Sequence, residues 1–207
     1  MFETLVAGAL MLADAVNPIQ SALDHYRDVA AYQVTVKSSG GTHSEILRYY
    51  FKQPGHVRME FVMPYNGAVL VYNPVRKQVR LWPFGYRSFP AFTLSPGNRL
   101  IQSATGQRVD RSDVGALYRN VQSLQEQGRT EIGGIELRDG KETLRVTVEG
   151  NGGYSVGMVH RYQLWLDRVT GFPIKVSSHD VTGRLIEVVE MEGLLIDPVL
   201  PDGFFDQ

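Results

Sequence analysis

The spacing of apolar residues changes near residue 31, and this change constrains the fold more than any other feature of the sequence. Residues 18–30, PIQSALDHYRDVA, carry apolar side chains at helical spacing, and Pro18 suits the first turn of a helix. From Tyr32 onward, apolar and polar residues alternate with a period of two, which is typical of strands. The sequence therefore predicts one short helix followed by a long β region.

Two groups of short strands are expected in that region. Five strands are predicted between residues 32 and 82, divided by the turn pairs Gly40-Gly41, Pro54-Gly55, Asn66-Gly67 and Asn73-Pro74. A second group of five is predicted over residues 130–138, 141–149, 158–167, 172–180 and 184–192. Because the connections are short, neighbouring strands within each group should be antiparallel.

Residues 83–128, between the two groups, have a different pattern. The stretch from Trp82 to Phe92, WPFGYRSFPAF, has five aromatic residues among eleven. Residues 111–127 then predict a helix, capped by Ser112 or Asp110 and ended by Gly128. Its apolar face consists of Val114, Leu117, Tyr118, Val121 and Leu124.

About ten strands with one apolar face need a cover, and only two or three helices are available to provide it. We therefore predict the α+β class: an unclosed, strongly curved antiparallel β-barrel, or half-barrel, of about ten strands, with helices over its concave face. Such a sheet would leave an apolar concavity that suits a lipid-like ligand. No linker or repeat divides residues 18–207, which are expected to form a single domain.

Residues 1–17 form an apolar N-terminal segment with two interpretations. The run LVAGALMLADAV over residues 5–16, ending near Ala13-Asp14-Ala15, fits the remnant of a secretory signal. The preceding MFET has no Lys or Arg, which favours the start of a buried helix instead. A signal remnant would make the protein periplasmic.

Composition and spacing argue against several kinds of chemistry. The 21 basic and 22 acidic residues give a net charge of −1, which does not fit a nucleic-acid-binding protein. The chain has no cysteine, which removes disulfides and thiolate ligands or nucleophiles. No two of its five histidines have metal-ligand spacing, and no G-x-S-x-G motif occurs. The sequence thus predicts a non-enzymatic protein with no cofactor and no metal.

A succession of short motifs runs over residues 18–205. The first half contains YFKQPGHVRMEF at 50–61, LVYN at 70–73 and RLWP at 80–83. The second half contains LWLD at 164–167, TGFP at 170–173, DVTG at 180–183 and LPDGFF at 200–205. In this order the motifs resemble those of the LolA-like lipoprotein-sorting superfamily. The match is divergent, since Gln53 stands where the lipoprotein carrier itself has an arginine before the proline.

The resemblance implies an open barrel, covered by helices, that carries acyl chains through the periplasm. We therefore expect a periplasmic binding or carrier protein for a lipoprotein acyl chain or another lipid. An envelope membrane protein and a transient contact with a membrane are compatible partners, and nucleic acid is not expected. The alternative is an envelope-stress sensor or protein-interaction module of the same fold, which a cavity filled by its own side chains would favour.

The ligand site is predicted from the alternation in the first group of strands. Residues two apart on a strand share a face, so Arg58, Glu60, Gln78 and Arg80 should point away from the cavity. The predicted cavity and lid residues are Phe51, Met59, Phe61, Val69, Val71, Leu81, Trp82, Phe84, Phe89, Phe92, Leu117 and Val121.

The aromatic segment 82–92 has two interpretations. Its side chains either gate the cavity, with Phe84, Phe89 and Phe92 at the rim, or fold down as part of the core. Cations interleave with aromatic residues in this part of the chain, at Arg58, Arg76, Lys77, Arg80 and Arg87. We interpret these cations as the solvated outer face of a sheet, with contact to lipid headgroups as the functional alternative.

Overall fold

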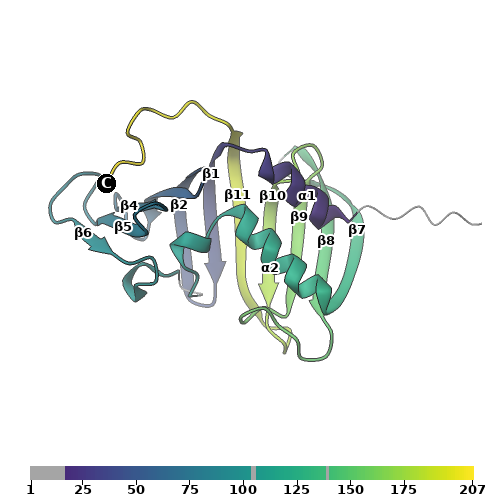
Figure 1. Ribbon diagram of the computed structural model, residues 1–207. Coiled ribbons are helices and arrows are strands. Elements are labelled where there is room, and N and C mark those ends of the chain that lie inside the picture. The colour runs from purple at the N-terminus through teal and green to yellow at the C-terminus, as the bar shows by residue number, and fades with distance from the viewer. Residues whose placement is uncertain (1–16, 104–105, 139) are drawn as a thin grey trace, which may run out of the picture.

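Helix α1 (Pro18–Arg27) is the first element of the described residues, and local sequence features explain where it begins. Asn17 caps it, since its side-chain oxygen accepts hydrogen bonds from the backbone N–H of Ile19 at 3.0 Å and of Gln20 at 3.4 Å. The computed structural model in Figure 1 describes residues 17–103, 106–138 and 140–207. Residues 1–16, interpreted above as a signal remnant or a helix start, lie outside the described residues.

Eleven strands occur in the described part of the chain, one more than the sequence predicts. They are β1 (Ala31–Gly40), β2 (His43–Lys52), β3 (His56–Met63), β4 (Val69–Asn73), β5 (Gln78–Trp82), β6 (Phe92–Leu94), β7 (Gly128–Arg138), β8 (Lys141–Gly150), β9 (Arg161–Asp167), β10 (Pro173–His179) and β11 (Leu185–Ile196). The additional strand is β6, at the end of the aromatic segment, which pairs with β5 over three residues.

All eleven strands belong to one antiparallel sheet with the order β6-β5-β4-β3-β2-β1-β11-β10-β9-β8-β7. The first meander runs outward from β1 to β6, and the chain then returns across the sheet. The second meander runs from β7 to β11, which pairs with β1. Strands β6 and β7 do not pair with each other, so the sheet is an open half-barrel. The predicted α+β half-barrel is confirmed.

Helix α2 (Val114–Glu126) makes the return crossing, preceded by the 3-10 helices η1 (Arg99–Ile101) and η2 (Val109–Arg111). Its cap is Asp113, whose carboxylate accepts from the N–H of Ala116 at 3.0 Å. The prediction of Ser112 or Asp110 as the cap was therefore wrong by one to three residues. Helices α1 and α2 contact each other and lie over the same face of the sheet (Figure 1).

The main core lies between the two helices and the concave face. Val146, Val148 and Leu164 from β8 and β9 are fully buried there, opposite Val121 and Leu124 of α2. Near the C-terminal end of α1, an aromatic cluster fills the space between helix and sheet. It consists of Tyr26, Tyr32, Tyr49, Phe51 and Phe172, whose ring centroids lie 5.3 to 6.2 Å apart in the contacting pairs.

A second, smaller core lies on the convex face of the first meander. Tyr50, Val69, Val71 and Trp82 pack there against Phe205 of the C-terminal segment. Gln207 fixes that segment to the sheet, because its side-chain amide donates to the carbonyl oxygens of Val71 and Gln78 at 3.0 and 2.9 Å. Both faces of β4 are therefore covered.

Candidate ligand-binding site

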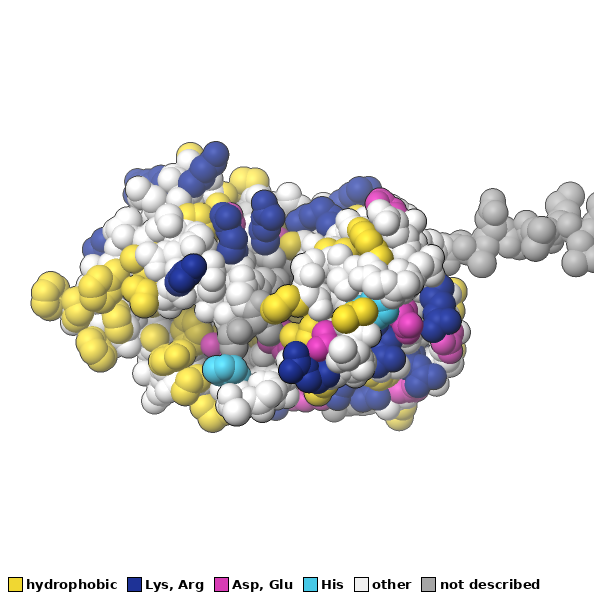
Figure 2. All heavy atoms as spheres, turned by 90° about the horizontal axis from the view of Figure 1, so that it is seen from below, with side chains coloured by type: hydrophobic (Ala, Val, Ile, Leu, Met, Phe, Trp, Pro, Cys, Tyr) yellow, Lys and Arg dark blue, Asp and Glu magenta, His cyan; other side chains and the backbone are white. Residues whose placement is uncertain are grey.

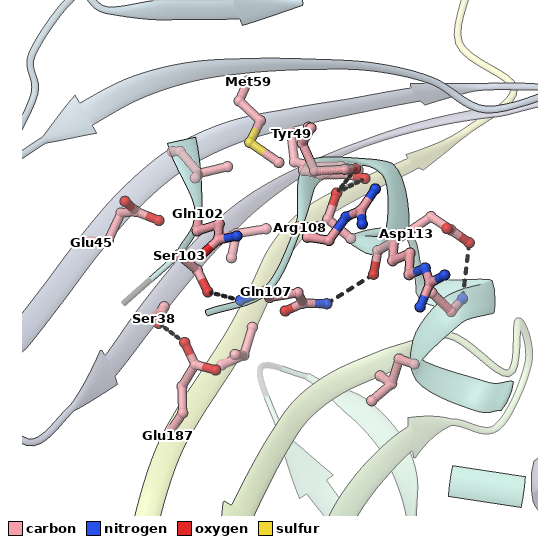
Figure 3. Close-up of a pocket in the computed structure, with 18 of the residues that line it drawn as sticks. Ser38, Glu45, Tyr49, Met59, Gln102, Ser103, Gln107, Arg108, Asp113 and Glu187 are labelled. Atoms are coloured by element: carbon pink, nitrogen blue, oxygen red, sulfur yellow. Dashed lines mark hydrogen bonds between the residues drawn. The ribbon is translucent and has the colours of Figure 1, made fainter. Parts of the chain in front are cut away.

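A cavity of about 1200 Å³ lies between the first meander and the segment that leads into α2. This volume exceeds the roughly 300–1,000 Å³ of common small-molecule sites. One wall is the concave face of the sheet from β1 to β5, together with β10 and β11. The other wall is the segment of η1 and η2, residues 99–103 and 106–113, which we call the cover segment (Figure 3).

The sheet side of the cavity is mainly apolar. Neighbouring strands place apolar side chains in register: Val36 lies opposite Leu47 and Met191, and Met59 lies opposite Leu70. Several of these side chains are only half-buried, unlike those under α2. The apolar lining includes Val34, Val36, Leu47, Met59, Phe61, Leu70, Leu81, Val156, Val159, Val176, Val189 and Met191, and α2 adds Leu117.

Two carboxylates face one part of this cavity, from strands on either side of β1. Ser38 on β1 lies opposite Glu45 on β2, and its hydroxyl donates to Glu187 on β11 (Figure 3). Burial, and secondarily the Glu187 carboxylate, raises the pKa of Glu45 above its ordinary value. This part of the wall can therefore accept hydrogen bonds from a polar group of a ligand.

Hydrogen bonds within the cover segment shape it locally. Gln107 donates from its backbone N–H to the Ser103 hydroxyl at 2.9 Å and from its side chain to the carbonyl oxygen of Arg111 at 3.0 Å (Figure 3). Arg108 binds Asp110 through two hydrogen bonds of 2.9 and 2.7 Å. The polar groups are thus largely paired within the segment, and Leu100, Ile101 and Val109 remain as its apolar contribution to the cavity.

Three tyrosine hydroxyls anchor the end of the cover segment where α2 begins. The Tyr26 hydroxyl donates to Asp113 at 3.0 Å, and the Tyr32 hydroxyl accepts from the N–H of Val114 at 3.2 Å. The Tyr49 hydroxyl lies 2.9 Å from Ser112 Oγ. Burial raises the pKa of all three hydroxyls well above the ordinary value, so they stay protonated. This anchor fixes the position of the cover segment over the sheet.

Four of the predicted site residues line the cavity: Met59, Phe61, Leu81 and Leu117. Phe51 and Val121 lie on the same side of the sheet but inside the packed core, Phe51 in the aromatic cluster and Val121 under α2. The alternation of β2 and β3 thus placed Phe51, Met59 and Phe61 on the expected face.

Val69, Val71 and Trp82 were placed on the wrong face. Met59 lies opposite Leu70, and Leu70 lies opposite Leu81, so Leu70 is the cavity residue of β4. Val69, Val71 and Trp82 instead form the convex core. The physical reason is that β4 is buried on both faces, so its continuous apolar run carries no alternation.

The predicted outward cations include one that is buried. Arg58 and Arg80 do lie on the convex face, where both pair with Val71, and Glu60 lies on the same face of β3. Arg58, however, is only 7% exposed. Its guanidinium lies between the rings of Tyr86 and Phe204, at 4.2 and 4.3 Å from their centroids, and donates to the Phe204 carbonyl oxygen at 2.8 Å. A salt bridge of 2.7 Å to Glu60 balances its charge.

The aromatic segment does not cover the cavity. Of its residues, Pro83 lines the cavity, while Phe84, Phe89 and Phe92 do not. Tyr86 and Ala91 pack on the convex core instead. Phe84 is 74% and Phe89 93% exposed, so neither is a core residue. Phe92 lies opposite Leu81 on the edge strand β6 and is 46% exposed.

Sequence reasoning missed the cover segment and its tyrosine anchor. A usable signal was length, because residues 83–113 form a connection far longer than ordinary loops, and such connections commonly contribute to binding sites. The tyrosines carried no signal, because alternation reports the face of a strand and not the partner of a hydroxyl group.

The described residues contain no group of three or more His, Asp or Glu side chains that could hold a metal ion. None of the helices in the described part of the chain is long and apolar enough to cross a membrane.

Comparisons by sequence find no relative: no family model matches the chain, and no curated protein matches it. Comparison with solved structures finds chains of similar fold. An uncharacterised conserved protein from Thermus thermophilus is 13% identical, with a TM-score of 0.58 over 92% of this chain and 94% of that one. The Mycobacterium tuberculosis lipoprotein LppX is 12% identical, with a TM-score of 0.55 over 89% and 96% of the two chains.

The complex of MucA and MucB from Pseudomonas aeruginosa also matches, at 16% identity and a TM-score of 0.50. The match covers 90% of this chain but 61% of that chain. LolA superfamily proteins are among the further matches. The matches with TM-scores of 0.50 to 0.58 show a likeness of fold, which agrees with the predicted LolA-like resemblance.

Proposed function

We propose that this protein binds the acyl chains of a lipid or lipoprotein in the cavity under the cover segment, as a binding or carrier protein of the periplasm. The observation that carries the proposal is the cavity itself, which has an apolar sheet wall and a volume of about 1200 Å³. Burial of acyl methylene groups would supply the affinity at about 0.8 kcal/mol per CH₂ group.

The polar part of the wall supports an amphiphilic ligand. Glu45, Ser38 and Glu187 offer hydrogen-bond acceptors beside an otherwise apolar surface, which is the pattern of a site for a ligand with one polar end. Likeness of fold to a lipoprotein, LppX, is compatible with this role. The periplasmic location is part of the proposal and comes from the resemblance to lipoprotein-sorting proteins.

Likeness of fold to MucB, which was solved in complex with MucA, supports a second candidate function, a protein-interaction module. That function requires no cavity. Because the main cavity is not filled by the side chains that line it, we favour the binding of a hydrophobic ligand.

Two neighbouring valines on β11 provide a matched test. Val189 lines the cavity, whereas Val188 does not, and both are half-buried. Val189→Trp should occupy part of the cavity and lower the affinity for a fluorescent fatty acid by about tenfold or more, since less apolar surface of the ligand can be buried. Val188→Trp should change that affinity by less than about twofold. The measurement is a fluorescence titration of both variants, with thermal unfolding to confirm that both are folded.

Equal affinities of the two folded variants would contradict ligand binding in this cavity. Native mass spectrometry of protein purified from cell envelopes provides an independent measurement. A co-purifying lipid is the expected result, and a protein partner with no lipid would favour the interaction module instead.

A further inference from the structure

Apolar side chains are exposed together at the β6 end of the sheet. They come from three segments: Tyr65 in the β3–β4 hairpin, Phe84 and Phe89 in the loop before β6, and Leu100 in η1. Their exposed fractions are 65%, 74%, 93% and 81%. We call these four residues, together with Phe92, the aromatic tip. Figure 2 shows apolar side chains gathered at this end of the molecule, with Lys and Arg side chains beside them.

The aromatic tip adjoins the cavity. Tyr65 and Leu100 line it as well as being exposed, and the half-buried Pro83, which precedes Phe84, lines it too. The cavity therefore reaches the molecular surface at the tip. On the convex side, Phe89 lies with Arg80, Arg87 and Trp82 around a small depression.

The charge of this region differs from that of the whole chain. Residues 61–109 contain six basic residues and no Asp or Glu, although the chain as a whole has a net charge of −1. Arg108 is neutralised by Asp110. In the described part of the chain, no carboxylate lies within salt-bridge distance of Arg80, Arg87 or Arg99.

Aromatic and leucine side chains next to arginines with no carboxylate partner among the described residues match the chemistry of the membrane–water interface. Phe and Leu can enter the boundary between headgroups and acyl chains, while arginine pairs with anionic headgroups. A monomeric soluble protein rarely leaves such apolar side chains clustered in water. A stretch with basic residues and no carboxylates complements an anionic surface.

We propose that the aromatic tip docks on the surface of a membrane that contains anionic lipid, with the cavity open toward the bilayer. The inference extends the proposed function but is measured separately from it, because Phe84, Phe89, Arg80 and Arg87 do not line the cavity. Vesicle binding tests the tip, and binding of a soluble fatty acid tests the cavity.

The experiment is flotation of the protein with vesicles of phosphatidylethanolamine and phosphatidylglycerol, compared with vesicles of phosphatidylcholine alone. The wild type should bind the anionic vesicles, and added salt should weaken that binding. Phe84→Ser/Phe89→Ser should lower the partition coefficient about tenfold or more. Arg80→Gln/Arg87→Gln should lower it about fivefold for each arginine removed. Both double variants should bind the fluorescent fatty acid as the wild type does.

Two controls match these changes elsewhere in the molecule. Arg76→Gln/Lys77→Gln removes the same charge from the turn at the other end of β4 and β5, where Lys77 lies about 10 Å from Arg80 and about 16 Å from Trp82 along the strand, beyond the screening length in physiological salt. Leu137→Ser/Val169→Ser removes two exposed apolar side chains, 75% and 88% accessible, from the other half of the sheet. Neither pair should change vesicle binding more than about twofold.

Several outcomes would overturn the proposal. A wild type that does not float with anionic vesicles would do so, as would a phenylalanine variant that binds as well as the wild type. Equal losses in the tip and control variants would show that net charge or general hydrophobicity is responsible. If sedimentation showed a dimer that only the tip variants disrupt, the tip would be an interface between two copies of this chain.

Discussion

The two halves of the sheet solve the problem of covering an apolar face in opposite ways. In the half from β7 to β11, α2 packs on the concave face of β8 and β9, where Val146, Val148 and Leu164 are inaccessible to solvent, and the cavity extends over β10 and β11. In the half from β1 to β6, the cover segment spans a cavity, and Met59, Phe61 and Leu81 are only partly buried.

On the convex face the difference between the two halves is reversed: the half with the cavity carries the apolar core there. Behind β7 to β11, the convex face carries ion pairs and a Trp165 side chain that donates to Glu136 at 2.8 Å. Behind the first meander, the C-terminal segment builds an apolar core around Arg58. The half of the sheet whose concave face lines the cavity thus buries additional apolar surface on its convex face. A hollow cavity and a stable sheet can coexist because two different faces provide them.

The largest expected effect is the difference between two core truncations, one under α2 and one beside the cavity. Leu164→Ala creates a new void under α2 and should lower the free energy of unfolding by about 3 kcal/mol. Phe61→Ala, although it removes more atoms, should cost about 1–2 kcal/mol, because part of its surface already faces the cavity. Urea unfolding of both variants measures the two values. A larger loss for Phe61→Ala than for Leu164→Ala would mean that the cavity half is packed as tightly as the other half.

The convex core offers the next test. Arg58→Ala removes two ring contacts and a hydrogen bond and leaves Glu60 without its close partner, so we expect a loss of about 2–3 kcal/mol in unfolding free energy. Arg48→Ala is the matched control, since Arg48 lies 3.9 Å from the same Glu60 but is exposed. Its loss should stay below about 0.5 kcal/mol. Similar losses of unfolding free energy for both variants would contradict a special contribution of the buried Arg58 to the convex core.

The smallest expected effect concerns pH and the polar part of the cavity. The pKa of Glu45 is raised mainly by burial and then by Glu187. When the pKa of a carboxyl group is higher in the folded than in the unfolded protein, its protonated form stabilises the fold. This contribution to the free energy of unfolding is complete below the pKa of the unfolded state and is lost as the pH rises through the pKa of the folded state. Glu45→Gln cannot ionise, so its stability relative to the wild type should increase from pH about 4 to pH about 7.

Chemical denaturation at those two pH values measures the change for Glu45→Gln. The control is Glu131→Gln, which replaces an exposed carboxylate on β7. A relative stability of Glu45→Gln that is the same at both pH values would contradict the burial of this carboxyl group in the cavity wall.

Local patterns in the sequence determined most of the fold. The change of period near residue 31 and the turn pairs that follow it gave the helix and nearly all the strands, because helix capping and hairpin turns depend on neighbouring residues. The alternation in β2 and β3 gave the face of Phe51, Met59 and Phe61, because one side of each strand is polar enough to be recognised. The limits of α2 were also predicted to within three residues, with Gly128 marking its end, although the cap is Asp113 and not Ser112 or Asp110.

Only the tertiary structure decided what covers each face. Val69 and Leu70 are equally apolar, and it is the pairing of Leu70 with Met59 that sends one to the cavity and the other to the convex core. Likewise, the residues near Arg58 in the sequence do not predict its contact with Phe204, which lies 146 residues away along the chain. The physical reason is that periodicity records how a strand divides its side chains between two faces, whereas burial depends on the distant segment that comes to rest on each of them.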